Sequence, residues 1–283
     1  MKVLENVPLG LYTTFRLGGP ARYLIECYSL EDVKNAIKFA LDKNLPILPL
    51  GAGSDILVSD SGFNGVVIRL VHLRGQRFQG EEVYLMAGEP LPKIAKITAD
   101  MGLSGFEYLA GIPGTVGGGI AKNAGAHGHD ISEILKEVYV VNLNGEIITL
   151  KPKDINLRYR ESDVLNYGIV VEGRFALKFD DPRVINERLN RFLKYREDTQ
   201  PWKTRTAGCM FKNPPGNYAG KLIEEAGLKG FRIGGVKVSE KHANFFENIG
   251  GTADDALRLI EYVQKRVYEV FKVELEVEIV LVK

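Results

Sequence analysis

Residues 111–128 read GIPGTVGGGIAKNAGAHG and form the densest glycine region of the chain. A single turn needs one or two glycines, whereas this segment places them along a continuous path. Backbone without Cβ atoms can approach a ligand such as a pyrophosphate closely, and the apolar neighbours argue against a flexible linker. The segment therefore favours a phosphate-binding loop over a linker.

A second glycine segment, residues 51–55, reads GAGSD and follows the short apolar run 46–50. Glycines after a strand allow backbone N–H groups to point at an oxyanion. The dinucleotide-binding fingerprint needs a third glycine where Ile56 stands, and no GxxxxGK[ST] sequence is present. A structural turn explains Gly51 and Gly53 equally well, so this loop alone is weak evidence for a phosphate site.

Helices and strands alternate around both segments, which predicts an α/β organisation. Residues 29–43 have helical apolar spacing behind a Ser29…Asp32 cap, and Thr252…Asp255 caps a helix over 253–271. Asn144-Gly145 predicts the turn of a hairpin over 138–150. Further helices are predicted at 181–198 and 218–226, and strands at 21–28, 46–50, 66–70, 169–179 and, by strict alternation, 273–282.

Composition describes an ordinary globular protein. The chain has 283 residues, 45% of them hydrophobic and 26% charged, with a net charge of +1. This length favours two or three compact units, and we place a boundary near residue 181, where Asp-Pro opens a polar helix. The small net charge provides no field that would attract nucleic acid or an anionic membrane, so neither is an expected partner.

The N-terminus lacks a secretory signal pattern, and no run of about 18 apolar residues could span a bilayer. We therefore expect a cytoplasmic protein. Cys27 and Cys209 are too few for a disulfide framework or a structural zinc site. His127, His129 and His242 lie in or beside motifs without a metal-ligand pattern, and no metal is predicted.

Several segments together resemble one family. They are TTFRLGG at 13–19, GAGSDILVSD at 51–60, GIPGTVGGGIAKNAGAHG at 111–128, LRYRES at 157–162, AGCMFKNP at 207–214, GGVKVSEKHANF at 234–245 and LEVE at 275–278. In this order they resemble the UDP-N-acetylenolpyruvoylglucosamine reductase (MurB) family, over nearly the whole chain. The segment between Phe179 and Thr206 is too short for the tyrosine-bearing loop of one branch, so the chain resembles the loop-lacking type II branch.

The resemblance implies a fold and a reaction. The fold is α/β (α+β), with a two-lobed FAD-binding region of the vanillyl-alcohol-oxidase (PCMH) type over 1–180, its lobes at about 1–70 and 71–180. A C-terminal α+β substrate-binding domain covers 181–283, and its last strand is a candidate to return to the FAD-binding region. The reaction is the reduction of UDP-N-acetylglucosamine enolpyruvate to UDP-N-acetylmuramate, with FAD as cofactor and NADPH as reducing co-substrate. A monomer is expected.

The resemblance also implies site residues. Arg160, Cys209 and Glu278 match the catalytic positions. Tyr159, Lys212, Asn213 and Asn244 match positions that hold the substrate. The predicted cofactor-binding residues are Gly51, Ala52, Gly53, Ser54, Asp55, Gly111, Ile112, Pro113, Gly114, Thr115, Gly117, Gly118, Asn123, Ala124 and Gly125.

Each catalytic assignment competes with a plainer explanation. Arg160 has the forked geometry that suits a carboxylate, but in this polar stretch it also fits a solvated surface arginine. Cys209 stands where many family members have a proton-donating serine, and an unperturbed thiol has a pKa of about 8.5, although a lone cysteine is more often a small buried hydrophobe. Glu278 shares one face of the predicted strand with Glu274 and Glu276, as a solvent-exposed row would.

Two rival functions remain open from the sequence. Another flavoenzyme of the same superfamily, such as an oxidase of an alcohol or sugar, would share the N-terminal loops but lack AGCMFKNP and SEKHANF. A nucleotide-binding module without catalysis would use the glycine loops for regulation. The C-terminal motifs favour the reductase over the first rival, and a bound flavin would distinguish it from the second.

Overall fold

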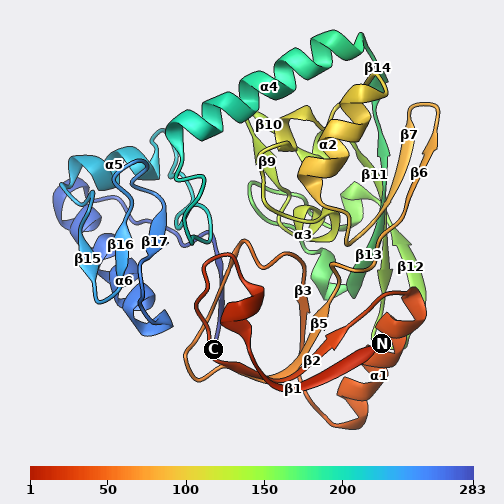
Figure 1. The fold of residues 1–283 in the computed structure, drawn as a ribbon, viewed down its shortest axis with the longest axis horizontal. Coiled ribbons are helices and arrows are strands. Elements are labelled where there is room, and N and C mark those ends of the chain that lie inside the picture. Colours follow the sequence, from red (N-terminus) through yellow and green to blue (C-terminus); the bar gives the residue numbers. More distant parts are fainter. The chain divides into compact units, whose positions relative to one another are not determined.

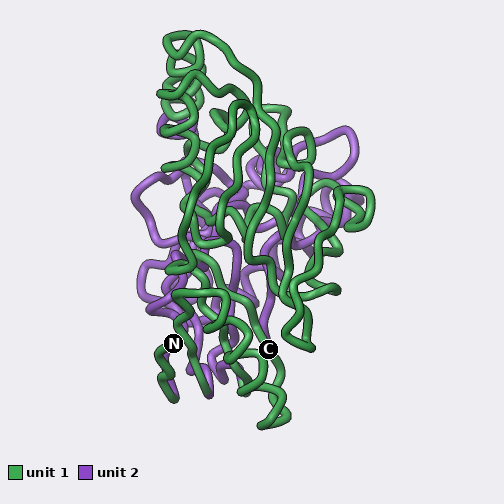
Figure 2. The backbone as a smooth tube through the Cα atoms, turned by 90° about the vertical axis from the view of Figure 1, so that its right-hand side faces the viewer, with its two compact units in different colours: residues 1–5, 23–52, 64–195 green, residues 6–22, 53–63, 196–283 purple.

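The computed structural model describes all 283 residues, which form two compact units (Figures 1 and 2). Unit 1 consists of Met1–Glu5, Tyr23–Ala52 and Asn64–Tyr195. Unit 2 consists of Asn6–Arg22, Gly53–Phe63 and Arg196–Lys283. Each unit has a hydrophobic core of its own. The sequential domain limits 1–180 and 181–283 stay a prediction.

The largest sheet of unit 1 is five-stranded, with the order β12-β11-β13-β7-β6. Every neighbouring pair is antiparallel. The predicted hairpin is confirmed, because β11 pairs with β12 and Gly145 between them has a φ of 79°. The strands are β6 (Gln76–Gln79), β7 (Glu82–Met86), β11 (Leu135–Val141), β12 (Ile147–Leu150) and β13 (Ile169–Ala176).

Helix α3 (Val116–Ala121) packs closely on this sheet. A Cβ atom on Gly173 of β13 would lie 2.8 Å from Cδ1 of Ile120, so glycine allows the close approach. In the same helix, a Cβ on Gly119 would lie 2.8 Å from Cδ1 of Ile131. Part of the glycine density in 111–128 is therefore explained by internal packing.

A second, four-stranded sheet has the order β1-β2-β5-β3. Its strands are β1 (Lys2–Pro8), β2 (Pro20–Glu26), β3 (Ile47–Leu50) and β5 (Phe63–Arg69). Helix α1 (Leu30–Asp42) connects β2 to β3, and the Ser29 hydroxyl accepts from the Asp32 N–H at 3.1 Å, which confirms the predicted cap. Strand β3 runs parallel to β5 and ends at Leu50, directly before the first glycine segment.

Shorter elements complete the first 200 residues. The helix predicted at 181–198 is confirmed as α4 (Pro182–Thr199). The others are η1 (Leu9–Tyr12), α2 (Leu91–Asp100), β8 (Leu103–Ser104), η2 (Glu107–Leu109), β9 (Gly125–Ala126), β10 (His129–Asp130), η3 (Ile131–Glu133), η4 (Pro152–Asp154), η5 (Val164–Asn166) and β14 (Lys178–Phe179).

Unit 2 packs two helices against a small sheet of the order β15-β16-β17. Helix α6 (Ala253–Phe271) has the predicted bounds and the predicted capping box of Thr252 and Asp255. The carboxylate of Asp60 accepts from the N–H groups of Ala253 and Asp254, so this motif residue also holds the start of α6. The other elements are α5 (Ala219–Glu225), β15 (Arg232–Ile233), β16 (Val236–Val238) and β17 (Phe246–Asn248).

The strand predicted over 273–282 is wrong in extent. Only β18 (Val280–Val282) forms a regular strand, and it pairs in parallel with β4 (Ile56–Val58). Before it, Val277 makes an isolated bridge with Phe211. None of the helices combines the length and the apolar composition that crossing a membrane requires.

Candidate functional site

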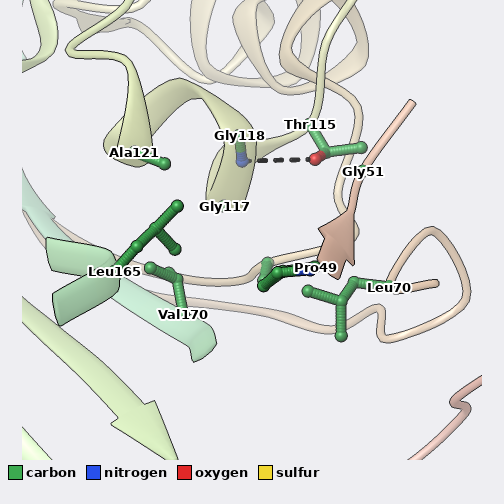
Figure 3. A pocket seen from close by; sticks show the side chains of 10 residues that line it. Pro49, Gly51, Leu70, Thr115, Gly117, Gly118, Ala121, Leu165 and Val170 are labelled. Atoms are coloured by element: carbon green, nitrogen blue, oxygen red, sulfur yellow. Dashed lines mark hydrogen bonds between the residues drawn. The ribbon is translucent and has the colours of Figure 1, made fainter. Parts of the chain in front are cut away.

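Unit 1 contains a small cavity of about 60 Å³ where β3 ends and α3 begins (Figure 3). Helix α3 lies on one side, and Pro49, Leu70 and Val170 lie on the other. The lining residues are Pro49, Gly51, Leu70, Ala87, Thr115, Gly117, Gly118, Ala121, Leu165 and Val170. The cavity therefore brings the two glycine segments together within one unit.

Thr115 caps α3 beside this cavity. It is buried, and its Oγ1 accepts from the N–H of Gly118 at 3.5 Å. A Cβ atom on Gly51 would lie only 2.6 Å from Oγ1 of Thr115, and a Cβ on Gly117 would lie 2.8 Å from the Cβ of Ala87. Gly51 keeps the cavity open, whereas Gly117 serves close packing against the sheet.

The cavity lining suits a nucleotide cofactor with a diphosphate. Hydroxyl and backbone N–H groups are the donors that bind phosphate oxygens without a charged side chain. No carboxylate lines the cavity, so no like charge opposes an anion there. The Cβ of an alanine at position 51 would fill part of the cavity beside Thr115. The cavity therefore depends on glycine at this position.

The other predicted cofactor residues lie in several places. Gly111, Ile112, Pro113 and Gly114 form the approach to α3, where the Gly114 N–H donates to the Ile112 carbonyl at 2.8 Å. Asn123, Ala124 and Gly125 follow the helix, and a Cβ on Gly125 would meet the His129 carbonyl at 2.3 Å. Contacts of these residues with the cofactor stay a prediction.

The first glycine segment is divided between the units, with Gly51 and Ala52 in unit 1 and Gly53, Ser54 and Asp55 in unit 2. Gly53 has a φ of 67°, and its carbonyl accepts from the Thr14 N–H at 2.9 Å. The Asp55 carbonyl accepts from the Val280 N–H at 3.0 Å. Within unit 2 these residues connect the loop to the last strand.

Arg160 lies at the tip of a tight hairpin in unit 1. The hairpin closes through Arg158 N–H to Glu161 O at 2.9 Å and Glu161 N–H to Arg158 O at 3.2 Å. Arg160 has a φ of 61°, a left-handed conformation that is uncommon for a non-glycine residue. Its guanidinium lies 5.2 Å from the ring centroid of Tyr159, which is 50% exposed. The strained turn presents both predicted residues at the end of a short loop.

In unit 2 the segment 209–212 lies between two other segments. On one side, the Met210 N–H donates to the Asn244 carbonyl at 2.8 Å, and Cys209 makes a bridge with Phe245. On the other side, the Glu278 N–H donates to the Met210 carbonyl at 2.8 Å. The backbones that carry Cys209 and Glu278 are therefore directly hydrogen-bonded neighbours, although the meeting of the two side chains stays a prediction.

The predicted substrate residues of unit 2 surround the same segment. Lys212 Nζ lies 2.7 Å from Oε1 of Glu276, and Asn213 Oδ1 accepts from the Ala219 N–H at the start of α5 at 3.0 Å. Asn244 is buried, and its side chain bonds the backbone of Phe211. All of these residues thus have a structural role within unit 2, and their contacts with substrate stay a prediction.

Cys27 has the plainer role that the sequence suggested. It is fully buried, and burial raises the pKa of its thiol to about 12. A thiol with this pKa stays protonated and unreactive at neutral pH. No group of three or more His, Cys, Asp or Glu residues has an arrangement that could hold a metal ion. Cys27 is therefore a residue of the hydrophobic core.

Sequence reasoning missed the apolar wall of the cavity. Pro49, Leu70, Ala87, Leu165 and Val170 come from separate parts of unit 1. Apolar residues at strand ends are indistinguishable in sequence from ordinary core residues. Only the tertiary structure brings them together.

Comparisons with known proteins agree with this geometry. Residues 21–151 match the family described as FAD binding domain, so the fold and the site define the chain as an FAD-binding protein. Residues 200–282 match the family described as UDP-N-acetylenolpyruvoylglucosamine reductase, C-terminal domain.

Relatives extend this match to the full length. The chain is 40% identical to the UDP-N-acetylenolpyruvoylglucosamine reductase of Anoxybacillus flavithermus, over 99% of this chain and 94% of that protein. It is also 40% identical to the reductase of Rubrobacter xylanophilus, over 96% and 92%. The crystal structure of the reductase from Thermus caldophilus matches with a TM-score of 0.86 and 35% identity, covering 100% of this chain and 98% of that chain. The chain belongs to the UDP-N-acetylenolpyruvoylglucosamine reductase family.

Proposed function

We propose that the chain reduces UDP-N-acetylglucosamine enolpyruvate to UDP-N-acetylmuramate, a step of peptidoglycan precursor synthesis, with FAD as cofactor and NADPH as reductant. One observation supports this function best. The segment of Cys209 is hydrogen-bonded to the segment of Glu278, and both lie in the residues that match the reductase C-terminal domain. A proton donor and an acidic group are thereby carried on adjacent backbones.

The cofactor supplies the transfer of a hydride between NADPH and the enolpyruvyl group. Gly51 and Thr115 would hold its diphosphate, through the backbone of Gly51 and the hydroxyl of Thr115. Gly117 and Gly118 would let it approach α3 closely, while their own N–H groups donate to the Ala87 carbonyl and to Oγ1 of Thr115. The rest of the cavity lining is mostly apolar. The remaining chemistry belongs to side chains outside it.

Arg160 binds the carboxylate of the enolpyruvyl group in this proposal. Its planar guanidinium donates two parallel hydrogen bonds to a carboxylate, and these strengthen when negative charge accumulates there during the reaction. The hairpin of residues 158–161 presents this side chain in unit 1. Tyr159, exposed beside it, packs against the substrate.

Cys209 donates the proton that completes the reduced product, and Glu278 assists this transfer. A thiol acts as a general acid when it lies within hydrogen-bond reach of the carbon that accepts the proton. Gly208, with a φ of 84°, precedes Cys209 and sets the direction in which the following segment begins. Lys212, Asn213 and Asn244 hold the uridine diphosphate part in this proposal, since an ammonium group and amides suit a diphosphate and uracil.

We place the protein in the cytoplasm as a monomer, where both NADPH and the nucleotide sugar are available. The role in cell-wall synthesis then extends to cell shape and cell division.

An assay with the FAD-loaded protein tests the function. We expect NADPH consumption that depends on the enolpyruvyl sugar. Sugar-independent oxygen consumption with simple alcohols would instead indicate an oxidase. A colourless protein that does not bind added FAD would indicate a nucleotide-binding module without catalysis.

A further inference from the structure

Asn123 is a buried asparagine directly after α3 whose side chain bonds two other segments of unit 1. It is 2% exposed and has a φ of 41°. Its Nδ2 donates to the Arg158 carbonyl at 3.0 Å, and its Oδ1 accepts from the Ser132 N–H at 3.1 Å. Both ends of the amide therefore bond protein backbone.

One of these bonds holds the Arg160 hairpin at its base. Arg158 pairs with Glu161 to close the hairpin. Next to it, the hydroxyl of Ser162 donates to the Ala121 carbonyl at 3.1 Å. The end of α3 thus binds the hairpin at two points, while the start of the same helix lines the cavity at Thr115, Gly117 and Gly118.

The hairpin needs such support. A two-stranded hairpin is marginally stable alone, and a left-handed arginine at its tip makes it less favourable. The buried amide of Asn123 restricts the movement of the hairpin, because leaving either end of the amide unpaired in the interior costs free energy. The six-residue helix α3 then connects the cavity to the hairpin.

We infer that Asn123 is a positioning residue for Arg160. Its side chain fixes the 158–161 hairpin to the end of α3, so that the guanidinium keeps a constant place relative to a cofactor bound at the start of the helix. This differs from the cofactor contact that the sequence predicts for Asn123. The inference rests on the proposed function, since it gives Arg160 a substrate to bind.

Two variants separate the contributions of Asn123. Asn123→Gly removes the side chain without a steric penalty at positive φ. Asn123→Asp keeps an acceptor for the Ser132 N–H but removes the donor to the Arg158 carbonyl. Asn142→Ala is the matched control, because Asn142 Oδ1 accepts from the N–H groups of Asn144 and Glu146 in a different turn of unit 1.

The first readout is hydrogen exchange of residues 156–163 in the FAD-loaded protein, which requires no catalysis. We expect faster exchange in both Asn123 variants and wild-type exchange in Asn142→Ala. The second readout is the Kd for FAD. It should stay within about twofold of the wild-type value, because the substitutions remove no direct contact with FAD. The third is kinetic: flavin reduction by NADPH stays unchanged, and turnover with the enolpyruvyl sugar falls about 10- to 100-fold, as expected for a misplaced group.

Unchanged exchange of 156–163 in both variants would overturn the inference, and so would wild-type exchange in Asn123→Asp alone, because the donor would then be dispensable. A weaker Kd for FAD with unchanged exchange would identify Asn123 as a cofactor contact instead. A wild-type protein without sugar-dependent NADPH consumption would refute the proposed function, while the exchange comparison would still decide whether Asn123 holds the hairpin.

Discussion

The side chain of Asn244 pairs with the backbone of Phe211 as a second strand would. Its Nδ2 donates to the Phe211 carbonyl at 2.8 Å, and its Oδ1 accepts from the Phe211 N–H at 3.0 Å. Phe211 is fully buried, so neither backbone group has water as an alternative partner. Asn244 therefore holds the segment that also carries Cys209 and Lys212.

Asn244→Ala should destabilise unit 2. Two buried backbone groups of Phe211 would lose their partner, which costs about 2 to 4 kcal/mol of unfolding free energy. The single tryptophan, Trp202, lies in unit 2, so its fluorescence during urea denaturation measures this change. Asn217→Ala is the control, since Asn217 Oδ1 accepts from the Tyr218 N–H at an exposed site, and it should cost less than about 0.5 kcal/mol. Equal losses in both variants would contradict the pairing argument.

Cys209→Ala should separate the two half-reactions. Reduction of the bound flavin by NADPH needs no proton donor at this position and should stay at the wild-type rate. Reoxidation by the enolpyruvyl sugar should slow about 10²- to 10⁴-fold, the usual contribution of a general acid. Cys209→Ser should retain substantial activity, because a hydroxyl can also donate a proton. Rapid-mixing kinetics measure both steps, and equal reoxidation rates for wild type and Cys209→Ala would exclude the proton-donor role.

The sequence predicted those parts of the fold that local signals determine. Helices α1 and α6 have the expected caps at Ser29 and Thr252, because capping depends on residues three positions apart. The strand over 273–282 was wrong in extent, because alternation gives a strand its two faces but not its hydrogen-bonding partners. Only residues from Val280 onward find a continuous partner, in β4.

The sequence motifs predicted which residues belong to the candidate site, but not which groups these residues contact. Gly51 and Thr115 were both predicted to bind the cofactor, and the structure places them at one cavity. The hydrogen bonds from Asn123 to Arg158 and from Asn244 to Phe211 had no signal in the sequence, since each spans more than thirty residues of chain. A motif indicates that such a residue matters, whereas only the tertiary structure indicates what it bonds.

Arg160→Lys should impair catalysis more than binding of FAD. Arginine and lysine have the same conformational cost at the φ of 61° of residue 160. The comparison therefore isolates the effect of the side-chain head group. A lysine cannot donate two parallel bonds to a carboxylate, and we expect kcat/KM for the sugar to fall on the order of 100-fold. Arg158→Lys is the control, because Arg158 is exposed and pairs with Asp163 at 3.1 Å, which contributes at most about 1 kcal/mol of stability. A loss of the same size in both variants would show that the effect is not specific to the head group of Arg160.

Acid should destabilise unit 2 through His242. Burial lowers the pKa of this imidazole below 6.5, and the nearby positive charges of Lys229 and Arg196 act in the same direction, against Glu224. Its Nδ1 accepts from the Asn244 N–H at 3.3 Å, and a proton on this atom would break that bond. The unfolded chain binds the proton more readily, so this contribution is complete above about pH 6.5 and is lost as the pH falls towards the lower pKa of the folded state.

The measurement compares wild type with His242→Gln, which is neutral at every pH. The Trp202 unfolding midpoint of the wild type should fall between pH 7 and pH 5 more steeply than that of the variant. Parallel curves would mean that His242 does not carry this dependence.

Gly51→Ala should weaken FAD binding through one identified contact. Gly51 has no positive φ, so alanine introduces no backbone strain, and the effect comes from its Cβ, which would lie 2.6 Å from Oγ1 of Thr115. We expect the Kd for FAD, measured by flavin fluorescence on the apoprotein, to rise at least about tenfold, or about 1.4 kcal/mol. The same substitution should cost less in a Thr115→Ala background, because the clashing hydroxyl is then absent. In Gly75→Ala, the new Cβ meets only the flexible Met86 side chain at 3.1 Å, and the Kd should stay at the wild-type value. If Gly51→Ala binds FAD as tightly as wild type, the cofactor diphosphate does not lie at this junction of β3 and α3.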